Sequence, residues 1–397
     1  MELHYGNLYW NKTKDQEVKF DKVRENIKTQ VLVVGGGMSG NLCANTLAKE
    51  GYRVSLVEKN RIGGGSSAAN TGLLQYTSDV MMHELAGDIG EKDAYLFYKM
   101  CLEAMEDLTA LSMELDESLG FRNRNSIYYA STFRDKKRLK DEYRLLNKYN
   151  FPVEYLSRRK LKAQFGLDKP NALRTWHDAD VNPYKFILSL SKQNTSLGVT
   201  YYEDTKLDLD KISENKIKTK DSYEIEFDYI VIATGYSHIY PPIKDKFQMY
   251  RTYAFATRPI KGPLWPGEAM FWETKNPYIY FRTTKDNRVV GGGLDKKSKR
   301  VEKSQSSIDR KNKNLIKEIQ GMFSNLNLEL EYSWNALFGA SKDGIPFIGS
   351  DPLYKNKLYL LGYEGNGTAY SMAGSKIILD LIRGKNNKYS HIVRVDR

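Results

Sequence analysis

The chain has 397 residues, of which 41% are hydrophobic and 28% are charged, and both values are ordinary for a folded globular protein. This length allows a full hydrophobic core and leaves room for two domains. The net charge of +12 comes from lysines spread along the chain, which favours a solvated surface over a nucleic-acid site. No apolar run reaches the roughly 20 residues of a membrane span. The five histidines and two cysteines have no metal-ligand spacing, so we expect no metal site.

The first 28 residues are polar and aromatic, and we expect them to form an arm that is anchored to the body by Tyr5, Tyr9 and Trp10. The arm has no apolar region of the kind found in a secretory signal. Cys43 and Cys101 are too few for a disulfide framework. These features predict a cytoplasmic protein.

Residues 30–58 carry the most informative pattern of the chain. Residues 31–34 are typical of a buried strand, residues 41–50 of a helix, and residues 54–57 of a second strand. A strand, a helix and a second strand in this order predict a βαβ unit with parallel strands.

Gly35, Gly37 and Gly40 separate the first strand from the helix at GxGxxG spacing. The first glycine allows a tight turn, the second lets the backbone approach a pyrophosphate, and the third lets helix and strand pack closely. The pyrophosphate would lie at the helix N-terminus. Glu58, at the end of the second strand, can accept hydrogen bonds from both ribose hydroxyls. The pattern predicts a site for a dinucleotide without a 2′-phosphate.

The rest of the chain alternates between α/β-like and β-rich parts. Beyond the βαβ unit, the pattern predicts one or two helices over residues 84–119, a strand over 126–131, a helix over 133–149, strands over 198–202 and 224–236, five or six β segments over 250–293, a helix over 308–323, and a strand, glycine turn and helix from 358 onward. Two interleaved halves are therefore expected.

Three further glycine-containing segments offer backbone donors. Residues 63–72 (GGGSSAANTG) can form a flexible loop or can wrap a pyrophosphate or ring edge. Residues 228–236 (DYIVIATGY) form a strand whose Gly235 would let the chain pass close to a cofactor. Gly362, Gly365 and Gly367 precede a helix and form either a tight turn or a second donor site.

These segments, taken in order, resemble the D-amino-acid oxidase/glycine oxidase family of FAD-dependent oxidoreductases. The likeness rests on VLVVGGGMSG with Glu58, GGGSSAANTGLL, DYIVIATG, PYIYFRTTKDNRVVGGGLD, and SWNALFGASKDGIPFIGSD followed by GYEGNG. It implies an oxidoreductase that transfers a hydride from an amine C–H to flavin N5. It also implies FAD as the cofactor. Sarcosine-oxidase-like members attach the flavin to a cysteine in the C-terminal half of the chain. Cys43 and Cys101 both lie in the N-terminal half, so the FAD would be bound non-covalently here.

The resemblance implies an α/β fold in which a Rossmann-like FAD-binding domain is interleaved with an antiparallel-sheet (α+β) substrate domain. After the arm (residues 1–28), we expect the FAD-binding domain to comprise residues 29–84, 151–239 and 331–397, and the substrate domain to comprise residues 85–150 and 240–330. The residues expected to bind FAD are Gly35, Gly37, Met38, Ser39, Gly40, Glu58, Lys59, Gly65, Ser66, Ser67, Asn70, Leu207, Thr234, Gly235, Gly362, Gly365, Asn366 and Gly367.

The chain departs from the family at the residue that pairs with a substrate carboxylate. Amino-acid-oxidising members carry an arginine in a W-x-G-L-R-P run, and Phe338 occupies that position here. A phenylalanine does not provide the bidentate donors that a carboxylate needs. Arg282 could supply a charge instead, or could be a surface strand residue. The candidates for an aromatic substrate pocket, or for plain sheet core, are Tyr128, Tyr129, Tyr253, Trp272, Tyr280 and Phe338.

The expected function is therefore oxidation of a C–N bond in an amine or amino-acid-like substrate. Two alternatives remain open: a flavoenzyme that acts on a modified tRNA base, and a dehydrogenase of another small substrate that passes electrons to a carrier. The sequence leaves open the amine, the electron acceptor (oxygen or a carrier) and the oligomeric state.

Overall fold

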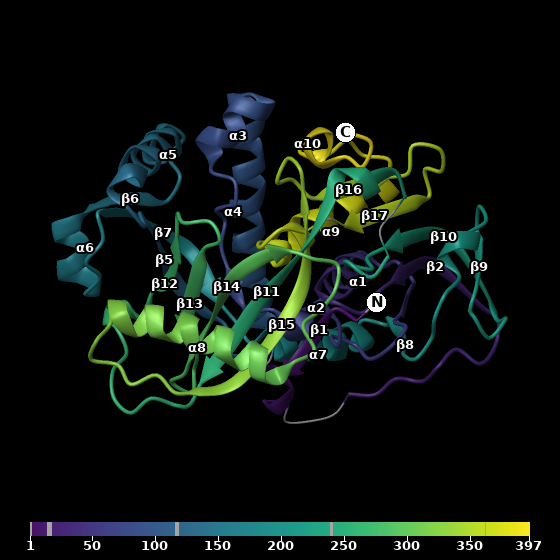
Figure 1. Ribbon diagram of the computed structural model, residues 1–397. Coiled ribbons are helices and arrows are strands. Elements are labelled where there is room, and N and C mark those ends of the chain that lie inside the picture. The colour runs from purple at the N-terminus through teal and green to yellow at the C-terminus, as the bar shows by residue number, and fades with distance from the viewer. Residues whose placement is uncertain (1, 14–17, 116–118, 239–240, 362) are drawn as a thin grey trace.

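The computed structural model describes residues 2–13, 18–115, 119–238, 241–361 and 363–397. Within these residues the chain forms a ten-stranded and a seven-stranded sheet, with helices packed on both (Figure 1). The α/β class predicted from the sequence is confirmed.

The seven-stranded sheet has a parallel centre in the order β17-β10-β2-β3-β8, and β16 and β9 add antiparallel strands. Its strands are β16 (Phe347–Ser350), β17 (Lys357–Leu361), β10 (Glu224–Ile232), β2 (Ile27–Val34), β3 (Val54–Val57), β8 (Thr200–Tyr202) and β9 (Lys216–Lys218). Successive side chains point to opposite faces, so Val31 and Val33 join one buried cluster while Leu32 and Val34 join another. Both faces are therefore covered, as parallel strands require.

The ten-stranded sheet is almost entirely antiparallel, with one parallel pair between β12 and β5. Its strands are β1 (His4–Asn7), β15 (Leu330–Ser341), β11 (Phe247–Thr257), β14 (Val289–Lys297), β13 (Ile279–Thr283), β12 (Met270–Glu273), β5 (Arg122–Tyr129), β7 (Asn171–Asp180), β4 (Leu73–Leu74) and β6 (Val153–Ser157). Its two faces pack differently, because α8 lies across one of them (Figure 1) and the other borders the cavity described below.

Helices cover both sheets. The helices are α1 (Met38–Lys49), α2 (Ser66–Ala69), α3 (Met82–Ile89), α4 (Glu91–Glu114), α5 (Lys136–Lys148), α6 (Arg158–Phe165), α7 (Pro183–Ser196), α8 (Gln305–Met322), α9 (Gly367–Ile382) and α10 (Ser390–Val393), with 3-10 turns η1 (Trp10–Lys12), η3 (Phe133–Asp135), η4 (Leu209–Lys211), η5 (Pro241–Lys246) and η6 (Pro266–Glu268). Helix α1 packs against α7 and α9, and nearly all of its residues are buried. No helix in the described ranges is long and apolar enough to cross a membrane.

The sheets divide the chain differently from the boundaries predicted above. Residues 153–180, expected in the FAD-binding domain, supply β6 and β7 to the ten-stranded sheet, and β15, at the start of 331–397, also lies in it. The predicted arm contributes β1, which pairs with β15, while Tyr9 and Trp10 are buried. The pairing of strands decides which sheet a segment belongs to. Each strand's backbone groups bond to a neighbouring strand that is distant in sequence, so the order of segments along the chain does not reveal it.

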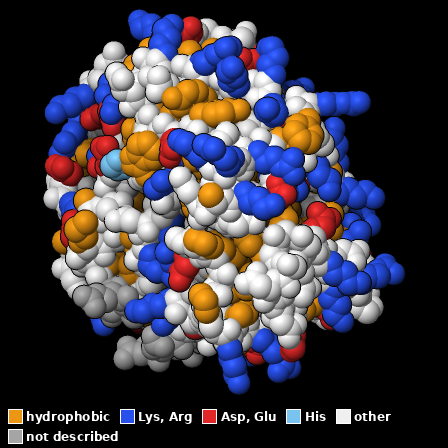
Figure 2. Space-filling model, turned by 90° about the vertical axis from the view of Figure 1, so that its left-hand side faces the viewer, with side chains coloured by type: hydrophobic (Ala, Val, Ile, Leu, Met, Phe, Trp, Pro, Cys, Tyr) orange, Lys and Arg blue, Asp and Glu red, His pale blue; other side chains and the backbone are white. Residues whose placement is uncertain are grey.

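The basic charge is spread over the surface. Figure 2 shows lysine and arginine side chains distributed across one face, among acidic and hydrophobic side chains. Many lysines and arginines of the described residues pair with acids, as Arg138 does with Glu84 and Lys148 with Glu91. The charge therefore has the pattern of a solvated face.

Candidate functional site

A cavity of about 980 Å³ lies where the two sheets approach each other. The seven-stranded sheet contributes the ends of β2 and β3 and the loops that follow them. The ten-stranded sheet contributes side chains of β11 to β15, among them Thr252, Trp272, Tyr280, Asp295 and Phe338. A pocket of this size at the carboxyl ends of parallel strands is where α/β proteins bind nucleotides.

The turn between β2 and α1 forms one wall of the cavity. Gly35 has φ +114°, a left-handed conformation that suits glycine, and Gly37 is the N-cap of α1. The Ser67 hydroxyl accepts a hydrogen bond from the Met38 N–H at 3.1 Å. Residues 35–39 all line the cavity, so the positive end of the α1 dipole faces it.

Gly40 has a different role from the other glycines of the motif. It does not line the cavity, and a Cβ at this position would lie 1.8 Å from the Gly35 carbonyl oxygen. The geometry agrees with the close helix–strand packing expected of Gly40, whereas a contact between Gly40 and the cofactor stays a prediction.

Glu58 follows β3 and is held in place by backbone donors. Its Oε2 accepts a hydrogen bond from the Gly36 N–H at 2.8 Å, and its Oε1 accepts one from the Asn60 N–H at 2.9 Å. Each carboxylate oxygen keeps a further acceptor position. Glu58 lines the cavity and can therefore receive hydroxyl donors from a ribose.

The remaining predicted cofactor residues lie around the same cavity. Lys59, Gly65, Ser66, Ser67, Asn70, Leu207, Thr234, Gly235, Gly365, Asn366 and Gly367 line it. Gly362 lies outside the described residues. The structure thus brings together four segments that are far apart in the sequence.

The cavity wall contains buried polar atoms that form no hydrogen bond within the described residues. Ser66 Oγ, Gln75 Nε2, Thr77 Oγ1, Trp272 Nε1 and Asp295 Oδ1 are buried and have no hydrogen-bond partner among the described residues. All five residues line the cavity. Buried polar atoms without partners cost free energy, so the wall is built for a ligand that carries both donors and acceptors.

The predicted substrate residues divide into two groups. Trp272, Tyr280 and Phe338 line the cavity, whereas the structure places Tyr253 and Arg282 away from it. On β11 the side chain of Thr252 faces the cavity, and successive side chains alternate between faces. Tyr253 therefore points the other way, into the cluster beneath α8.

Arg282 is a structural residue buried between the two halves. Its guanidinium donates to the carbonyl oxygens of Thr71 at 2.8 Å, Val181 at 2.7 Å and Thr283 at 2.9 Å. Asp180 lies 3.6 Å away, and the side chain is only 2% exposed. Burial lowers the pKa of Arg282 to about 10. With these donors already used, Arg282 is not placed to bind a substrate carboxylate.

Three carboxyl groups on the cavity wall were not predicted from the sequence. They are Asp79 in the loop before α3, Asp295 on β14, and Glu364 in the loop before α9. Burial raises the pKa of all three, to about 6 for Asp295 and to about 8 for Glu364, and the negative charge of Asp79 adds to both shifts. Isolated acids in unrelated segments carry no local sequence signal for this arrangement.

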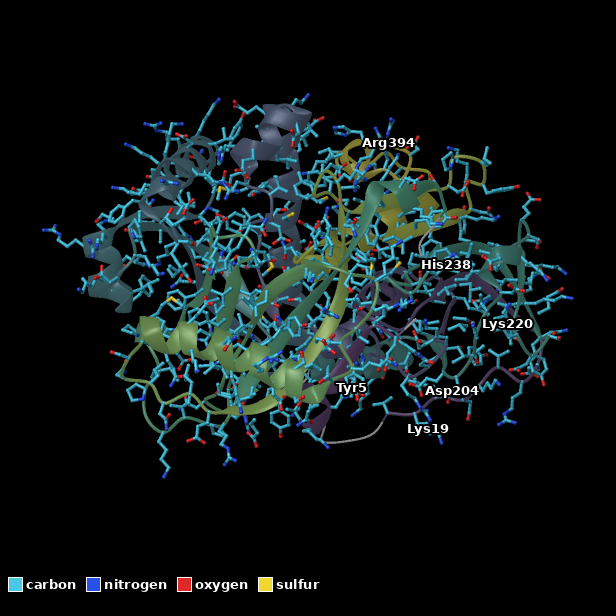
Figure 3. All side chains as sticks on the ribbon, viewed as in Figure 1. Tyr5, Lys19, Asp204, Lys220, His238 and Arg394 are labelled. Atoms are coloured by element: carbon cyan, nitrogen blue, oxygen red, sulfur yellow. The ribbon has the colours of Figure 1, made fainter. Side chains whose placement is uncertain are left out.

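The cavity has two electrostatically different ends. Its described lysines and arginines are Lys59, Arg61, Lys206 and Lys220, all on loops of the seven-stranded sheet. Figure 3 shows Lys220 and His238 at the end of the molecule formed by β9 and β10. There Lys220 pairs with Asp208 at 2.8 Å. The lining from β11 to β15 contains no lysine or arginine among the described residues.

The family described as "FAD dependent oxidoreductase" (DAO) matches residues 30–381. The chain belongs to this family. It is 25% identical over 386 residues to a glycine oxidase of Bacillus subtilis, covering 93% of this chain and 97% of that protein. It is 21% identical over 397 residues to a gamma-glutamylputrescine oxidoreductase of Escherichia coli, covering 97% and 91%. A glycine oxidase structure from Geobacillus kaustophilus has a TM-score of 0.79 at 21% identity, covering 94% and 99%.

Membership makes the protein an FAD-dependent oxidoreductase, which confirms the predicted family, cofactor and enzyme class. The observed walls fit the cofactor. Gly37 and the α1 N-terminus suit the pyrophosphate, Glu58 suits the ribose, and the unpartnered atoms of Ser66, Gln75 and Thr77 suit a ring that carries donors and acceptors. No group of three or more histidine, cysteine, aspartate or glutamate side chains in the described residues could hold a metal ion.

Proposed function

We propose that this enzyme oxidises the C–N bond of an amine that has no α-carboxylate. The observation that carries the proposal is the cavity wall around Phe338. Phe338 lines the cavity where the resemblance placed a carboxylate-binding arginine, and Arg282 is committed to backbone carbonyls. A carboxylate at this end would meet buried acids and no described cation, which disfavours it.

The aromatic residues of the ten-stranded sheet give the wall its shape. Trp272, Tyr278 and Tyr280 line the cavity, and their rings are near one another, with centroids 6.5 Å apart for the first pair and 5.8 Å for the second. Aromatic faces attract cationic amines and pack against methylene groups. The similarity to a gamma-glutamylputrescine oxidoreductase of Escherichia coli supports a substrate of this class.

Bound FAD supplies the oxidant, because flavin N5 accepts a hydride from the substrate carbon next to nitrogen. The protein's residues bind and orient the amine, and the surrounding walls restrict water. Loss of the hydride and a proton leaves an imine, which water hydrolyses to a carbonyl compound and, from a primary amine, ammonia. No catalytic histidine is required for this chemistry.

FAD is expected to be held without a covalent bond. Cys43 and Cys101 are fully buried, and neither lines the cavity. Burial raises the pKa of Cys43 to about 12, so its thiol is unreactive. Acid precipitation should therefore release all of the flavin into the supernatant.

An anaerobic flavin-reduction screen tests the proposed function. Purified enzyme is mixed with butylamine, other amines without a carboxylate, glycine, sarcosine and D-alanine, and bleaching of the flavin band is followed. We expect an amine without an α-carboxylate to reduce the flavin fastest. If glycine, sarcosine or D-alanine were best by a wide margin, the proposal would be wrong. Peroxide formation in air then distinguishes oxygen from a carrier as acceptor.

A further inference from the structure

The three cavity carboxyls come from separate elements yet share one end of the cavity. Asp79 Oδ2 accepts from the Gly365 N–H at 2.7 Å, and its Oδ1 accepts from the Tyr278 hydroxyl at 3.4 Å. Glu364 accepts hydrogen bonds from the backbone N–H of Ser341 and, at 2.9 Å, from its hydroxyl. All of these donors are neutral. Within the described residues none of the three carboxyls forms an ion pair.

Two other buried acids, Asp180 and Glu203, have arginine partners. Asp180 pairs with Arg122 at 2.7 Å and with Arg124 at 3.1 Å. Glu203 pairs with Arg61 at 2.8 Å and also accepts a hydrogen bond from a backbone N–H. A buried carboxylate needs a cation or several donors to remain stable. Asp79, Asp295 and Glu364 thus lack the cationic partner that Asp180 and Glu203 have.

Two atoms at this end point independently to a ligand. Asp295 Oδ1 is buried with no hydrogen-bond partner among the described residues. Trp272 is 94% buried, lines the same cavity, and its Nε1 also has no described partner. An ammonium group of a ligand would donate to Asp295 Oδ1, and an unprotonated amine nitrogen of the same ligand would accept from the Trp272 N–H.

Mutual repulsion among the acids favours a cationic ligand. The charge of Asp79 raises the pKa of Asp295 and of Glu364, so the three carboxyls resist full ionisation while the site lacks a cation. Asp343, which also faces Glu364, adds to this repulsion and is itself paired with Arg397. A bound ammonium would reverse the effect and favour the ionised carboxylates.

We propose that the substrate is a diamine, whose distal ammonium is held by Asp79, Asp295 and Glu364 while its other amine is oxidised. This inference rests on the proposed function and names the substrate class for the same site. The methylene chain between the two nitrogens packs along Trp272, Tyr278 and Tyr280. Bound FAD would supply the oxidant for the other amine as described above, and the distal ammonium takes no part in that oxidation.

Three compounds with a four-carbon chain test the inference: butane-1,4-diamine, butylamine and 4-aminobutanoate. They place an ammonium, a methyl and a carboxylate at the distal end. Anaerobic stopped-flow measurements give the limiting rate of flavin reduction and, from its concentration dependence, the apparent Kd. We expect the ratio of rate to Kd to be at least tenfold higher for the diamine than for butylamine, and lowest for 4-aminobutanoate.

Variants then connect the preference to the acids. Asp295→Asn should lower the ratio of diamine to butylamine flavin reduction at least fivefold, mainly by raising the apparent Kd of the diamine. Asp88→Asn, an exposed acid on α3, is the matched control and should retain the full preference. Flavin content, from the ratio of visible to ultraviolet absorbance, confirms that each variant is folded and loaded.

The outcomes separate the two proposals. Equal reduction by diamine and butylamine would overturn the diamine inference and leave amine oxidation standing. A diamine preference that survives Asp295→Asn and Asp79→Asn would overturn the assignment to the acids. Flavin that no amine reduces would overturn both.

Discussion

The α-carbon of Gly40 faces the carbonyl oxygen of Gly35 so closely that a Cβ at Gly40 would lie 1.8 Å from that oxygen. The contact joins the first turn of α1 to the end of β2. Because the obstacle is backbone, no side-chain rearrangement can relieve it. The nucleotide-binding turn can therefore take this position only because residue 40 is a glycine without a Cβ.

Gly40→Ala should displace α1 from the sheet and lower FAD occupancy severely, with little soluble holoenzyme recovered. Flavin per protein and thermal unfolding measure the effect. Gly87→Ala is the matched control, because Gly87 lies in α3 with no atom within 4 Å of an added Cβ. That change should raise stability by about 0.5–1 kcal/mol. Normal flavin loading of Gly40→Ala would contradict the packing argument.

Glu58→Gln should weaken FAD binding by roughly tenfold, or about 1.4 kcal/mol, because the neutral amide replaces a charged acceptor. The Kd follows from the recovery of flavin absorbance or the quenching of FAD fluorescence on titrating the flavin-free protein. Glu106→Gln on exposed α4 surface is the control and should leave the Kd unchanged. Equal Kd values for all three proteins would show that Glu58 does not contact the cofactor.

Arg282→Lys should reduce stability without altering the chemistry. A lysine does not reach the three carbonyl oxygens that the guanidinium binds, so we expect a loss of about 2–4 kcal/mol. The rate of flavin reduction per bound flavin should stay within about twofold. Arg134→Lys, at an exposed arginine, should change neither quantity. A large rise in substrate Kd with normal stability would instead make Arg282 a substrate ligand.

Glu364→Gln should change how stability depends on pH. Burial, and then Asp79, raise the pKa of Glu364 from 4.5 to about 8, so its neutral form is the one that favours folding. The stabilisation is complete below pH 4.5 and is lost as the pH rises through about 8. The variant stays neutral, so its Tm relative to wild type should increase by a few degrees between pH 5 and pH 9. Parallel Tm curves across this range would contradict the assignment.

Phe338→Arg should shift the preference toward carboxylate-bearing substrates. An arginine at this lining position can pair with an α-carboxylate and with the nearby acids. We expect flavin reduction by glycine to rise at least roughly tenfold relative to butylamine, equivalent to about 1.4 kcal/mol. Phe338→Leu removes the ring without adding a charge, so it should not raise the rate of flavin reduction by glycine. If both variants raised this rate by a similar factor, the space in the cavity, and not its charge, would limit the oxidation of glycine.

Much of the fold could be read from local patterns. The strands and helix around the glycines, the two helices of residues 82–114 and the long β-rich region all occur near their predicted positions. Strand β7 was not predicted. Its sequence, NALRTWHDAD, contains Asp178 and Asp180, which look like surface residues but are buried by hydrogen bonds and by arginines from β5. Its partners β4, β5 and β6 are separate segments, so no local pattern reveals the burial.

The sequence by itself determined the cofactor half, because the βαβ unit, its glycines and Glu58 interact within about 30 residues and their spacing alone sets the geometry. The tertiary structure decided which side chains line the substrate end of the cavity. Strand alternation turned Tyr253 away from the cavity, and contacts with Thr71 and Val181 occupied Arg282. The two sheets then brought Asp79, Asp295 and Glu364 together from segments more than 60 residues apart. Such contacts depend on how the sheets pack, and the order of residues along the chain does not specify them.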